Sequence, residues 1–338
     1  MRAVRVTEFT DPQEYIIEEI PTPTPGPGEL LVAIHTAAIN FGDTLIATGR
    51  YQVRPKRPFT PGAEFSGTVV AVGDSVTEFE QGDRIAAMGF VGSSRSNERI
   101  MGGCAEMAIV PVRNALRLFE SIELEQAALF RSNTETAYFG LVEGRLRMGE
   151  TLLVLGASGG TGYAAVALGK LMGARVIASA STETKRNIAL AAGANIAIDN
   201  NAPDWRAQVD AFAGPNGVQV VYDPVGGDYT ERAFRTLGYG GRHLVIGFAA
   251  GTIPKLPVNL PLMKGASLVG ANLLRAWEND PISIERNAKF LIGLFARREI
   301  SVPPVARRYT LTETAEAMRD VASGKTAGRV VISVHSQH

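Results

Sequence analysis

The segment TLLVLGASGGTG, residues Thr151–Gly162, combines an uninterrupted apolar run with a cluster of glycines. The run TLLVLG is typical of a parallel strand that is covered on both faces. Read as a dinucleotide-binding turn, the cluster has Gly159 and Gly162 in the second and third glycine positions, and Ala157 in the first. Gly159 lets the backbone approach a pyrophosphate, and Gly162 lets a helix pack closely on the sheet. The segment therefore predicts a strand, a phosphate-binding turn and a helix.

The phosphate contacts predicted from this turn are made by the main chain. Backbone N–H groups of Ser158, Gly160 and Thr161 are the expected donors, because the first N–H groups of a helix are unpaired. A glycine-rich turn that binds no ligand is the alternative. The repeated β-α units that follow favour the first interpretation, since they build a doubly wound parallel sheet. Further strands are expected at 175–179, 195–199, 218–223, 242–248 and 267–272, with helices at 163–173 and 183–193 that each close on glycine.

The strand after the glycine turn indicates which dinucleotide is bound. A carboxylate about 20 residues beyond the glycines would bind the ribose of NAD, whereas a basic neighbourhood accommodates the 2′-phosphate of NADP. Here RVIASAS ends without a carboxylate, and Ser181 and Lys185 follow it, so NADPH is the expected cofactor. Glu183 lies between them, but as a first-turn helix residue it can point to solvent. The alternative is that Lys185 and Arg186 only solvate a helix face.

The first third of the chain has a different pattern, with short strands separated by turns. Prolines throughout 21–29 exclude a helix there, because each one fixes φ and removes a donor. Apolar runs at 30–39, 66–73 and 81–89 are bounded by glycine and proline and predict strands. Together they indicate an all-β unit, a partly open barrel.

Changes of pattern give the expected domain boundaries. A helical stretch begins near Ile122 and leads into the alternating strands and helices. After a helical segment at 284–297, the tail from Ser301 returns to short elements and ends in the strand-like RVVISV. We therefore expect one domain formed by 1–121 with 300–338, and a nucleotide-binding domain at 122–299.

Composition excludes several classes of function. Apolar residues make up 45% of the 338 and charged residues 20%, which supports a well-packed core. The 34 basic residues balance the 34 acidic ones, so no global charge attracts nucleic acid or an anionic membrane. A single cysteine, Cys104, excludes an internal disulfide and a multi-cysteine zinc site. With no apolar signal-like start and no long apolar span, we expect a cytoplasmic protein without a membrane segment.

Motifs spread over the whole chain resemble one family. They are NFGDTLIATGRY, PFTPGAEFSGTVVAVG, GDRIAAMG, GGCAEMAIVP, LVLGASGGTG, VYDPVGGDYTERAF and KTAGRVVIS. Jointly they are similar to the zinc-free quinone oxidoreductases of the medium-chain dehydrogenase/reductase superfamily, the group that includes zeta-crystallin and the quinone oxidoreductase-like proteins. The resemblance implies an α/β protein with a GroES-like, partly open β-barrel catalytic domain and a Rossmann domain.

The resemblance also predicts that no metal is bound. Zinc alcohol dehydrogenases of this superfamily hold the metal with the Cys of a C-x-x-D segment and the His of a G-H-E segment. At the matching places this chain has NFGD at 40–43 and GAE at 62–64, so both ligands are absent. His35 and His243 lie in strand patterns and are expected to be ordinary strand residues.

Three residues are the expected catalytic set by analogy with the family. Asn40 stands where a metal ligand would otherwise be, and its amide can bond a ribose, a nicotinamide or a substrate carbonyl. Tyr51 and Thr136 are the further donors that the resemblance implies. The alternatives are a loop asparagine that satisfies backbone groups, a surface tyrosine, and a helix threonine bonded to its own backbone. Asp43 and Glu64 are interpreted mainly as structural acceptors.

Further cofactor contacts are implied by position in the family pattern. Asn200 is expected on the adenosine side, and Ile246, Gly247 and Phe248 are expected along the nicotinamide. Arg329 occupies a basic position near the cofactor in relatives, with a solvated tail charge as its alternative. The segment 93–103 is expected to be a mobile loop with lid behaviour.

Without a Lewis acid, the predicted chemistry is hydride addition to a carbon that is already electrophilic. The first hypothesis is an NADPH-dependent reductase of quinones or α,β-unsaturated carbonyls. A second is an enoyl-CoA reductase, in which a basic run meets CoA phosphates, although a solvated loop explains that run too. A third is an NADPH-binding structural or RNA-binding protein, which the zero net charge disfavours. The basic run consists of Arg50, Arg54, Lys56 and Arg57.

The expected partners are a small-molecule quinone or enone and further copies of the chain. The strand at 267–272 resembles the edge through which relatives pair, so a homodimer or homotetramer is expected. No nucleic acid and no membrane partner is expected.

Overall fold

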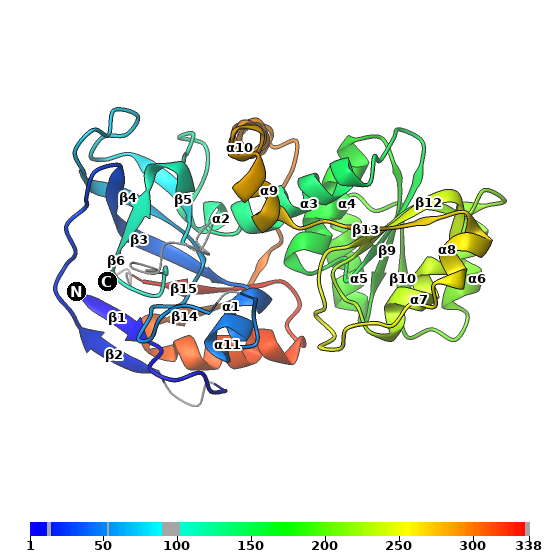
Figure 1. Ribbon diagram of the computed structural model, residues 1–338, viewed down its shortest axis with the longest axis horizontal. Helices are drawn as coiled ribbons and strands as arrows, with labels where there is room; N and C mark the ends of the chain where they lie inside the picture. The colour runs from blue at the N-terminus through cyan, green and yellow to red at the C-terminus, as the bar shows by residue number, and fades with distance from the viewer. Residues whose placement is uncertain (12–14, 53, 90–101, 335–338) are drawn as a thin grey trace. The chain divides into compact units, whose positions relative to one another are not determined.

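The computed structural model describes residues 1–11, 15–52, 54–89 and 102–334 (Figure 1). The chain divides into two compact units. The first comprises Met1–Ser132, Leu274–Ala296 and Val305–His338, and the second comprises Asn133–Leu273 and Arg297–Pro304. The helical segment 274–296 thus belongs to the first unit, whereas the sequence prediction placed it in the nucleotide-binding domain; the predicted boundaries stay a prediction.

The first unit contains a seven-stranded sheet. Its strands follow the order β14-β15-β3-β4-β5-β7, with β6 pairing to β3. The central strand β3 is almost wholly buried, because β4, β6 and β15 all pair with it. The strands are β3 Glu29–Ile39, β4 Glu64–Val72, β5 Arg84–Met88, β6 Met107–Pro111, β7 Ala115–Arg117, β14 Val305–Thr310 and β15 Arg329–Ser333, and β1 Arg2–Arg5 pairs with β2 Ile16–Glu19 apart from them.

The first unit also contains helices, and the core of its sheet is apolar. Ile34, Phe65 and Ile85 are fully buried at its centre. Farther along the chain, the rings of Phe130 and Phe295 stack with their centroids 5.0 Å apart. The helices are α1 Phe41–Ala47, α2 Leu124–Ala127, α9 Leu273–Asn279, α10 Pro281–Ala296 and α11 Thr314–Ser323, with 3₁₀ turns at Val112–Asn114 and Leu311–Glu313.

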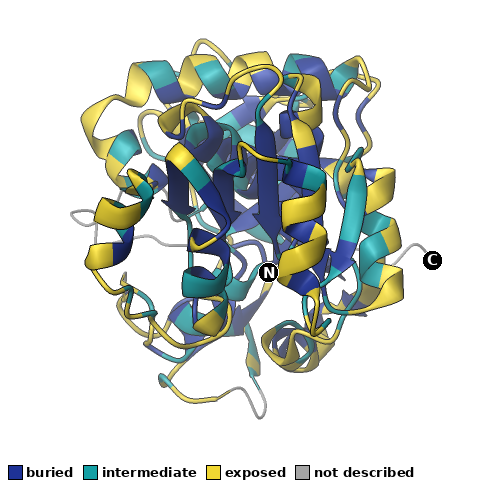
Figure 2. Ribbon diagram, turned by 90° about the vertical axis from the view of Figure 1, so that its right-hand side faces the viewer, coloured by how far each residue is buried: buried dark blue, intermediate teal, exposed yellow. Residues whose placement is uncertain are grey.

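The second unit is a doubly wound parallel sheet. Its six strands have the order β10-β9-β8-β11-β12-β13, and every neighbouring pair is parallel. Figure 2 shows the buried strands between helices whose outer sides are exposed. The strands are β8 Thr151–Leu155, β9 Arg175–Ala180, β10 Ile196–Asp199, β11 Val218–Asp223, β12 Leu237–Val245 and β13 Ser267–Gly270. The helices are α3 Arg131–Glu143, which begins in the first unit, α4 Gly160–Leu171, α5 Glu183–Ala191, α6 Trp205–Ala213, α7 Asp228–Phe234 and α8 Asn259–Lys264.

The fold class predicted from the sequence is confirmed, and the expected strands lie within a few residues of the observed ones. One prediction is wrong in detail, since the strand expected at 242–248 ends at Val245. Ile246 and Gly247 leave the sheet because both of their N–H groups turn to the carbonyl of Asp223. No helix among the described residues combines the length and the apolar character that crossing a bilayer requires.

Candidate functional site

The glycine turn after β8 is built by contacts that only glycine permits. Gly156 has φ of 58°, a left-handed conformation that side chains disfavour. A Cβ on Gly162 would lie 2.3 Å from the carbonyl oxygen of Gly156, so a larger residue would push helix α4 off the turn. The predicted role of Gly162 in close packing follows from this geometry.

The same turn leaves main-chain donors for a ligand. Gly159 is the N-cap of α4 and supplies no side-chain hydrogen bond to the first turn. Ser158 is buried at the turn, and Gly160 and Thr161 open the helix. The orphan N–H groups of a twelve-residue helix, next to a position without a Cβ, fit the diphosphate of a dinucleotide.

The end of β9 carries the residues expected at a 2′-phosphate. Ser181 follows the strand directly, and Lys185 lies in the first turns of α5. Burial lowers the pKa of the half-buried Lys185 ammonium. Glu183 is exposed in the first turn of α5, as predicted. Arg186 is 3.0 Å from Asp199 and therefore balances a carboxylate already present in the protein.

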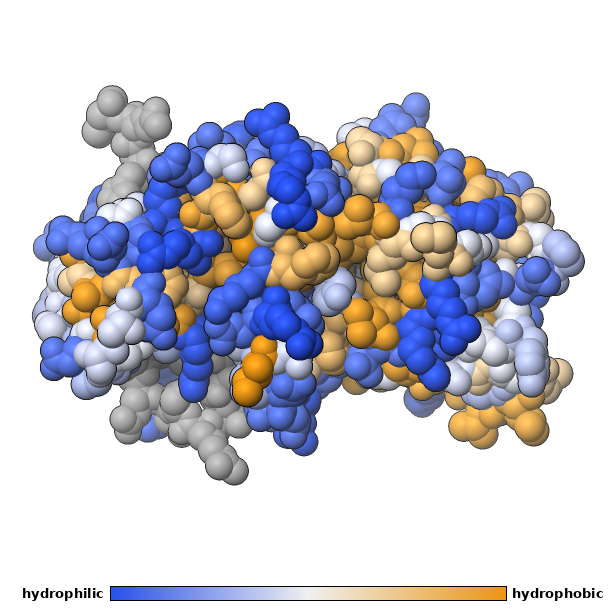
Figure 3. Space-filling model, turned by 90° about the horizontal axis from the view of Figure 1, so that it is seen from above, coloured by the Kyte–Doolittle hydropathy of each residue, from blue (hydrophilic) through white to orange (hydrophobic). Residues whose placement is uncertain are grey.

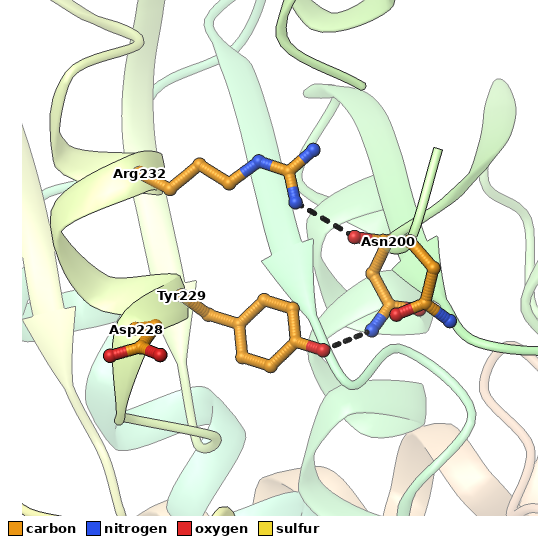
Figure 4. Close-up of a pocket in the computed structure, with 5 residues that line it drawn as sticks. Asn200, Asp228, Tyr229 and Arg232 are labelled. Carbon is orange, nitrogen blue, oxygen red and sulfur yellow. Dashed lines mark hydrogen bonds between the residues drawn. The ribbon is translucent and has the colours of Figure 1, made fainter. Parts of the chain in front are cut away.

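A cavity of about 370 Å³ opens beside the end of β10. Asn200 donates from Nδ2 to the Tyr229 hydroxyl at 3.0 Å, and Arg232 donates to the Asn200 carbonyl at 2.8 Å (Figure 4). Asn201 and Asp228 complete the lining. The predicted adenosine-side residue thus lies in a polar hollow that carries both donors and acceptors.

Asp223, which the sequence analysis did not single out, organises the loops after β11 and β12. Its carboxylate accepts hydrogen bonds from the Val225 and Gly226 N–H groups and from the Thr230 hydroxyl, and it lies 3.0 Å from Nε2 of His243. Burial alone would raise the pKa of Asp223, but the His243 contact and these donors outweigh it and lower that pKa. The signal in the sequence that could have identified Asp223 was a carboxylate at the end of a strand pattern, with Gly226 and Gly227 shortly after it. His243 is a β12 residue, as predicted, and is fully buried.

The predicted nicotinamide loop is tied to Asp223 by backbone bonds. The Ile246 N–H donates to the Asp223 carbonyl at 3.0 Å, and the Gly247 N–H does so at 3.3 Å. Phe248 is 38% exposed, and its ring approaches Gly226 so closely that a Cβ there would lie 2.9 Å from Cδ1 of the ring. The second unit therefore brings the glycine turn, Ser181, Asn200 and this loop to the carboxyl ends of its strands, where open α/β sheets bind ligands.

In the first unit, Asn40 lies between two charged side chains. Arg329 donates from Nη2 to Asn40 Oδ1 at 2.5 Å, and Asn40 Nδ2 donates to Glu64 Oε2 at 3.1 Å. The second Glu64 oxygen accepts the Ser132 N–H at 2.8 Å. Arg329 thus contacts Asn40, and its predicted position near the cofactor stays a prediction.

Asp43 is the second carboxylate of this cluster. It accepts the N–H groups of Asn40 and Ala63, each at 2.8 Å, which agrees with its predicted structural role. Burial raises the pKa of Asp43 to about 6 against the lowering effect of these bonds. Burial also lowers the pKa of the Arg329 guanidinium, whereas the charges of Glu64 and Asp43 act to raise it.

The donor set near Asn40 does not resemble a zinc site. Among residues 1–11, 15–52, 54–89 and 102–334, no three His, Cys, Asp or Glu side chains gather into a group able to hold a metal ion. Cys104 is buried, and burial raises the pKa of its thiol. His35 lies exposed on β3 and bonds the neighbouring Thr36.

The other candidates lie as follows. Tyr51 packs against Val6, Ile46 and Phe59, and burial raises the pKa of its hydroxyl. Thr136 is half-buried on α3 of the second unit.

Two members of the basic run are engaged within the first unit. Arg50 pairs with Asp11, and Arg57 lies over the Phe9 ring. Most of the predicted lid at 93–103 lies outside the described residues.

Comparison with known families agrees with these features. The family model "Alcohol dehydrogenase GroES-like domain" matches residues 26–120, and "Zinc-binding dehydrogenase" matches residues 160–285. The chain is 34% identical to the quinone oxidoreductase-like protein 2 of Bos taurus, over 98% of this chain and 92% of that protein. It is 29% identical to the human quinone oxidoreductase, over 98% and 97% of the two chains.

Solved structures give the same relationship. The quinone oxidoreductase of Thermus thermophilus, whose structure was also solved in complex with NADPH, is 27% identical. It superposes with a TM-score of 0.81 over 99% of this chain and all of that one.

Proposed function

Because the chain belongs to the family of quinone oxidoreductase-like proteins, we propose that it is an NADPH-dependent oxidoreductase that reduces a quinone or an α,β-unsaturated carbonyl without a metal. The observation that carries the proposal is the glycine turn, where α4 begins after Gly159 without a side-chain cap and only a glycine at 162 fits against the Gly156 carbonyl. The Thermus thermophilus relative supports NADPH as the cofactor. The lack of a carboxylate at the end of β9 supports the same choice.

The residues divide the work as follows. Bound NADPH supplies hydride to an electrophilic carbon. Main-chain donors at 158–162 would hold the diphosphate, and Ser181 and Lys185 would hold the 2′-phosphate. Asn200 would contact the adenosine, and the 246–248 loop would line the nicotinamide. Asn40, Tyr51 and Thr136 supply hydrogen bonds to the substrate, whose oxygen gains negative charge as the carbon is reduced.

The test is direct. Purified protein is mixed with NADPH or NADH and a panel of quinones and enones, and loss of absorbance at the nicotinamide band is followed for each pair. We expect turnover with NADPH and at least one acceptor. No oxidation of either cofactor across the panel would overturn the proposal, and crotonyl-CoA turnover without quinone turnover would replace it with the enoyl reductase alternative.

We also propose that two copies pair through the β13 edge of the second unit. An edge strand presents unpaired backbone groups, and a two-fold axis would place two such edges together. Figure 3 shows several groups of apolar side chains on the surface. In this unit, the exposed apolar residues include Tyr239, Leu262, Met263 and Leu268, which are between 49% and 94% exposed. Light scattering of Leu268→Lys should show monomers where the unaltered chain shows dimers or tetramers.

A further inference from the structure

The position of Asn40 in the sheet places it between two fixed charges. Asn40 follows directly on β3, the strand that lies between β15 and β4. Arg329 begins β15, where the next residue, Val330, pairs with Ile39. Glu64 begins β4 and pairs with Ala38. Backbone pairing on both sides therefore holds both charged residues beside the Asn40 amide.

The chemistry of arginine decides which way this amide faces. A guanidinium has five N–H donors and no acceptor, so the Asn40 atom 2.5 Å from Arg329 must be the carbonyl oxygen. The NH₂ group then faces Glu64, whose carboxylate accepts one of its two N–H bonds. Because Arg329 and Glu64 are 8% and 1% exposed, water does not compete strongly for either contact.

One donor remains. Asn40 is half-buried, and its second N–H meets no acceptor among the described residues. The guanidinium at the carbonyl oxygen also draws electron density from the amide nitrogen and strengthens that N–H as a donor. A free asparagine could turn its oxygen to a substrate hydroxyl, whereas this one is held as a donor.

We propose that Arg329 and Glu64 are positioning residues that hold Asn40 with an N–H available to a substrate carbonyl oxygen. The inference rests on the proposed reductase function and adds to it the two residues that fix the orientation of the Asn40 amide. Hydride from NADPH forms the new C–H bond, and the electron pair of the polarised double bond moves to the carbonyl oxygen. Asn40 donates a hydrogen bond to that oxygen, and water supplies the proton.

Double-mutant cycles separate positioning from a merely structural role. We expect Asn40→Ala to lower kcat about 100-fold, the usual effect of removing one donor to a developing oxyanion. Arg329→Gln should lower kcat about 10-fold in the unaltered chain, yet less than about 2-fold when Asn40 is already alanine, since coupled residues are non-additive. Arg329→Lys, which keeps the charge and a donor, should recover most of the loss. Equal losses in both backgrounds would overturn the inference.

A second measurement, by NMR, does not depend on enzymatic activity. It therefore tests the orientation of the Asn40 amide even where a variant folds poorly and loses activity, or where the proposed function is wrong. With selective ¹⁵N-asparagine labelling, the Asn40 NH₂ pair is assigned as the one missing from Asn40→Ala. We expect two well-separated proton shifts, with the downfield one moving in Glu64→Gln and the pair shifting in Arg329→Lys. An Asn40 pair that responds to neither variant would overturn the orientation, whether or not the protein turns over NADPH. Absence of turnover with the expected NMR response would instead count only against the proposed function.

Discussion

Asp43 in the first unit and Asp223 in the second are buried to the same extent, each 2% exposed, but their pKa values move in opposite directions. Each accepts two backbone N–H groups at 2.8 or 2.9 Å, and the Gly62 backbone also lowers the pKa of Asp43. Asp223 also accepts the Thr230 hydroxyl and contacts His243, whereas Asp43 shares the single charge of Arg329 with Glu64.

The contrast shows that burial alone does not decide the state of a carboxylate. Desolvation acts on both groups, and its effect is reversed only where the protein supplies enough donors to the charged form. Asp223 has that set and serves as a fixed anchor for two loops. Asp43 does not, and its pKa rises to about 6.

The largest expected effect comes from removing the better-satisfied carboxylate. Asp223→Ala leaves two N–H groups, a hydroxyl and an imidazole without their acceptor, and should lower the free energy of unfolding by about 3–5 kcal/mol. Urea unfolding at pH 7 measures the loss. The matched control is Asp228→Ala, which removes an exposed carboxylate five residues further along the chain at the start of α7 and should cost little. Equal costs for the two variants would show that the bonds to Asp223 do not stabilise the fold.

The second prediction concerns the pH dependence of stability, which should have opposite signs for the two carboxylates. The folded pKa of Asp43, about 6, lies above its unfolded value, so the folded state binds the extra proton and gains stability as pH falls through 6. The gain is about 3 kcal/mol, complete near the unfolded pKa of about 4. Asp223, whose folded pKa is lowered, contributes stability above its unfolded value that is lost as pH falls through the folded one.

The measurement compares unfolding free energies from pH 4.5 to 7.5 for the unaltered chain and Asp43→Asn. The variant should lose the part of the slope that Asp43 contributes, although it also loses one backbone bond because an amide has a single acceptor atom. An unchanged slope would show that Asp43 is ionised throughout this range.

The glycine turn of the second unit and the Asn40 cluster of the first also differ in how far the sequence could predict them. The glycine turn was predicted residue by residue, because Gly159 and Gly162 act through local backbone geometry that their spacing already encodes. The contact between Asn40 and Arg329 joins residues 289 positions apart, and no local pattern shows that β15 lies beside β3. Asp223 was part of a recognised motif, yet its role depends on His243 from the next strand, a pairing visible only in the sheet.

A smaller effect would sharpen the account of the Asp223 site. Thr230→Val keeps the shape of the side chain and removes the hydroxyl that donates to Asp223 at 2.6 Å. It should raise the pKa of Asp223 and cost about 1–2 kcal/mol at pH 7. Thr230→Ser, which keeps the donor, is the control for the loss of packing. If serine and valine cost the same, the hydroxyl does not contribute to the low pKa of this carboxylate.

The smallest predicted effect extends the comparison to a cation. Burial lowers the pKa of Lys185 just as it raises that of Asp43, and a 2′-phosphate would supply the opposite charge that favours the ammonium form. Lys185→Ala should therefore lower the NADPH:NADH ratio of kcat/KM about 10-fold, equivalent to about 1.4 kcal/mol. Lys170→Ala, an exposed lysine in the last turn of α4, is the matched control and should leave the ratio unchanged. Because NADH lacks the phosphate, equal losses with both cofactors would place Lys185 away from it and return the residue to a solvated helix face.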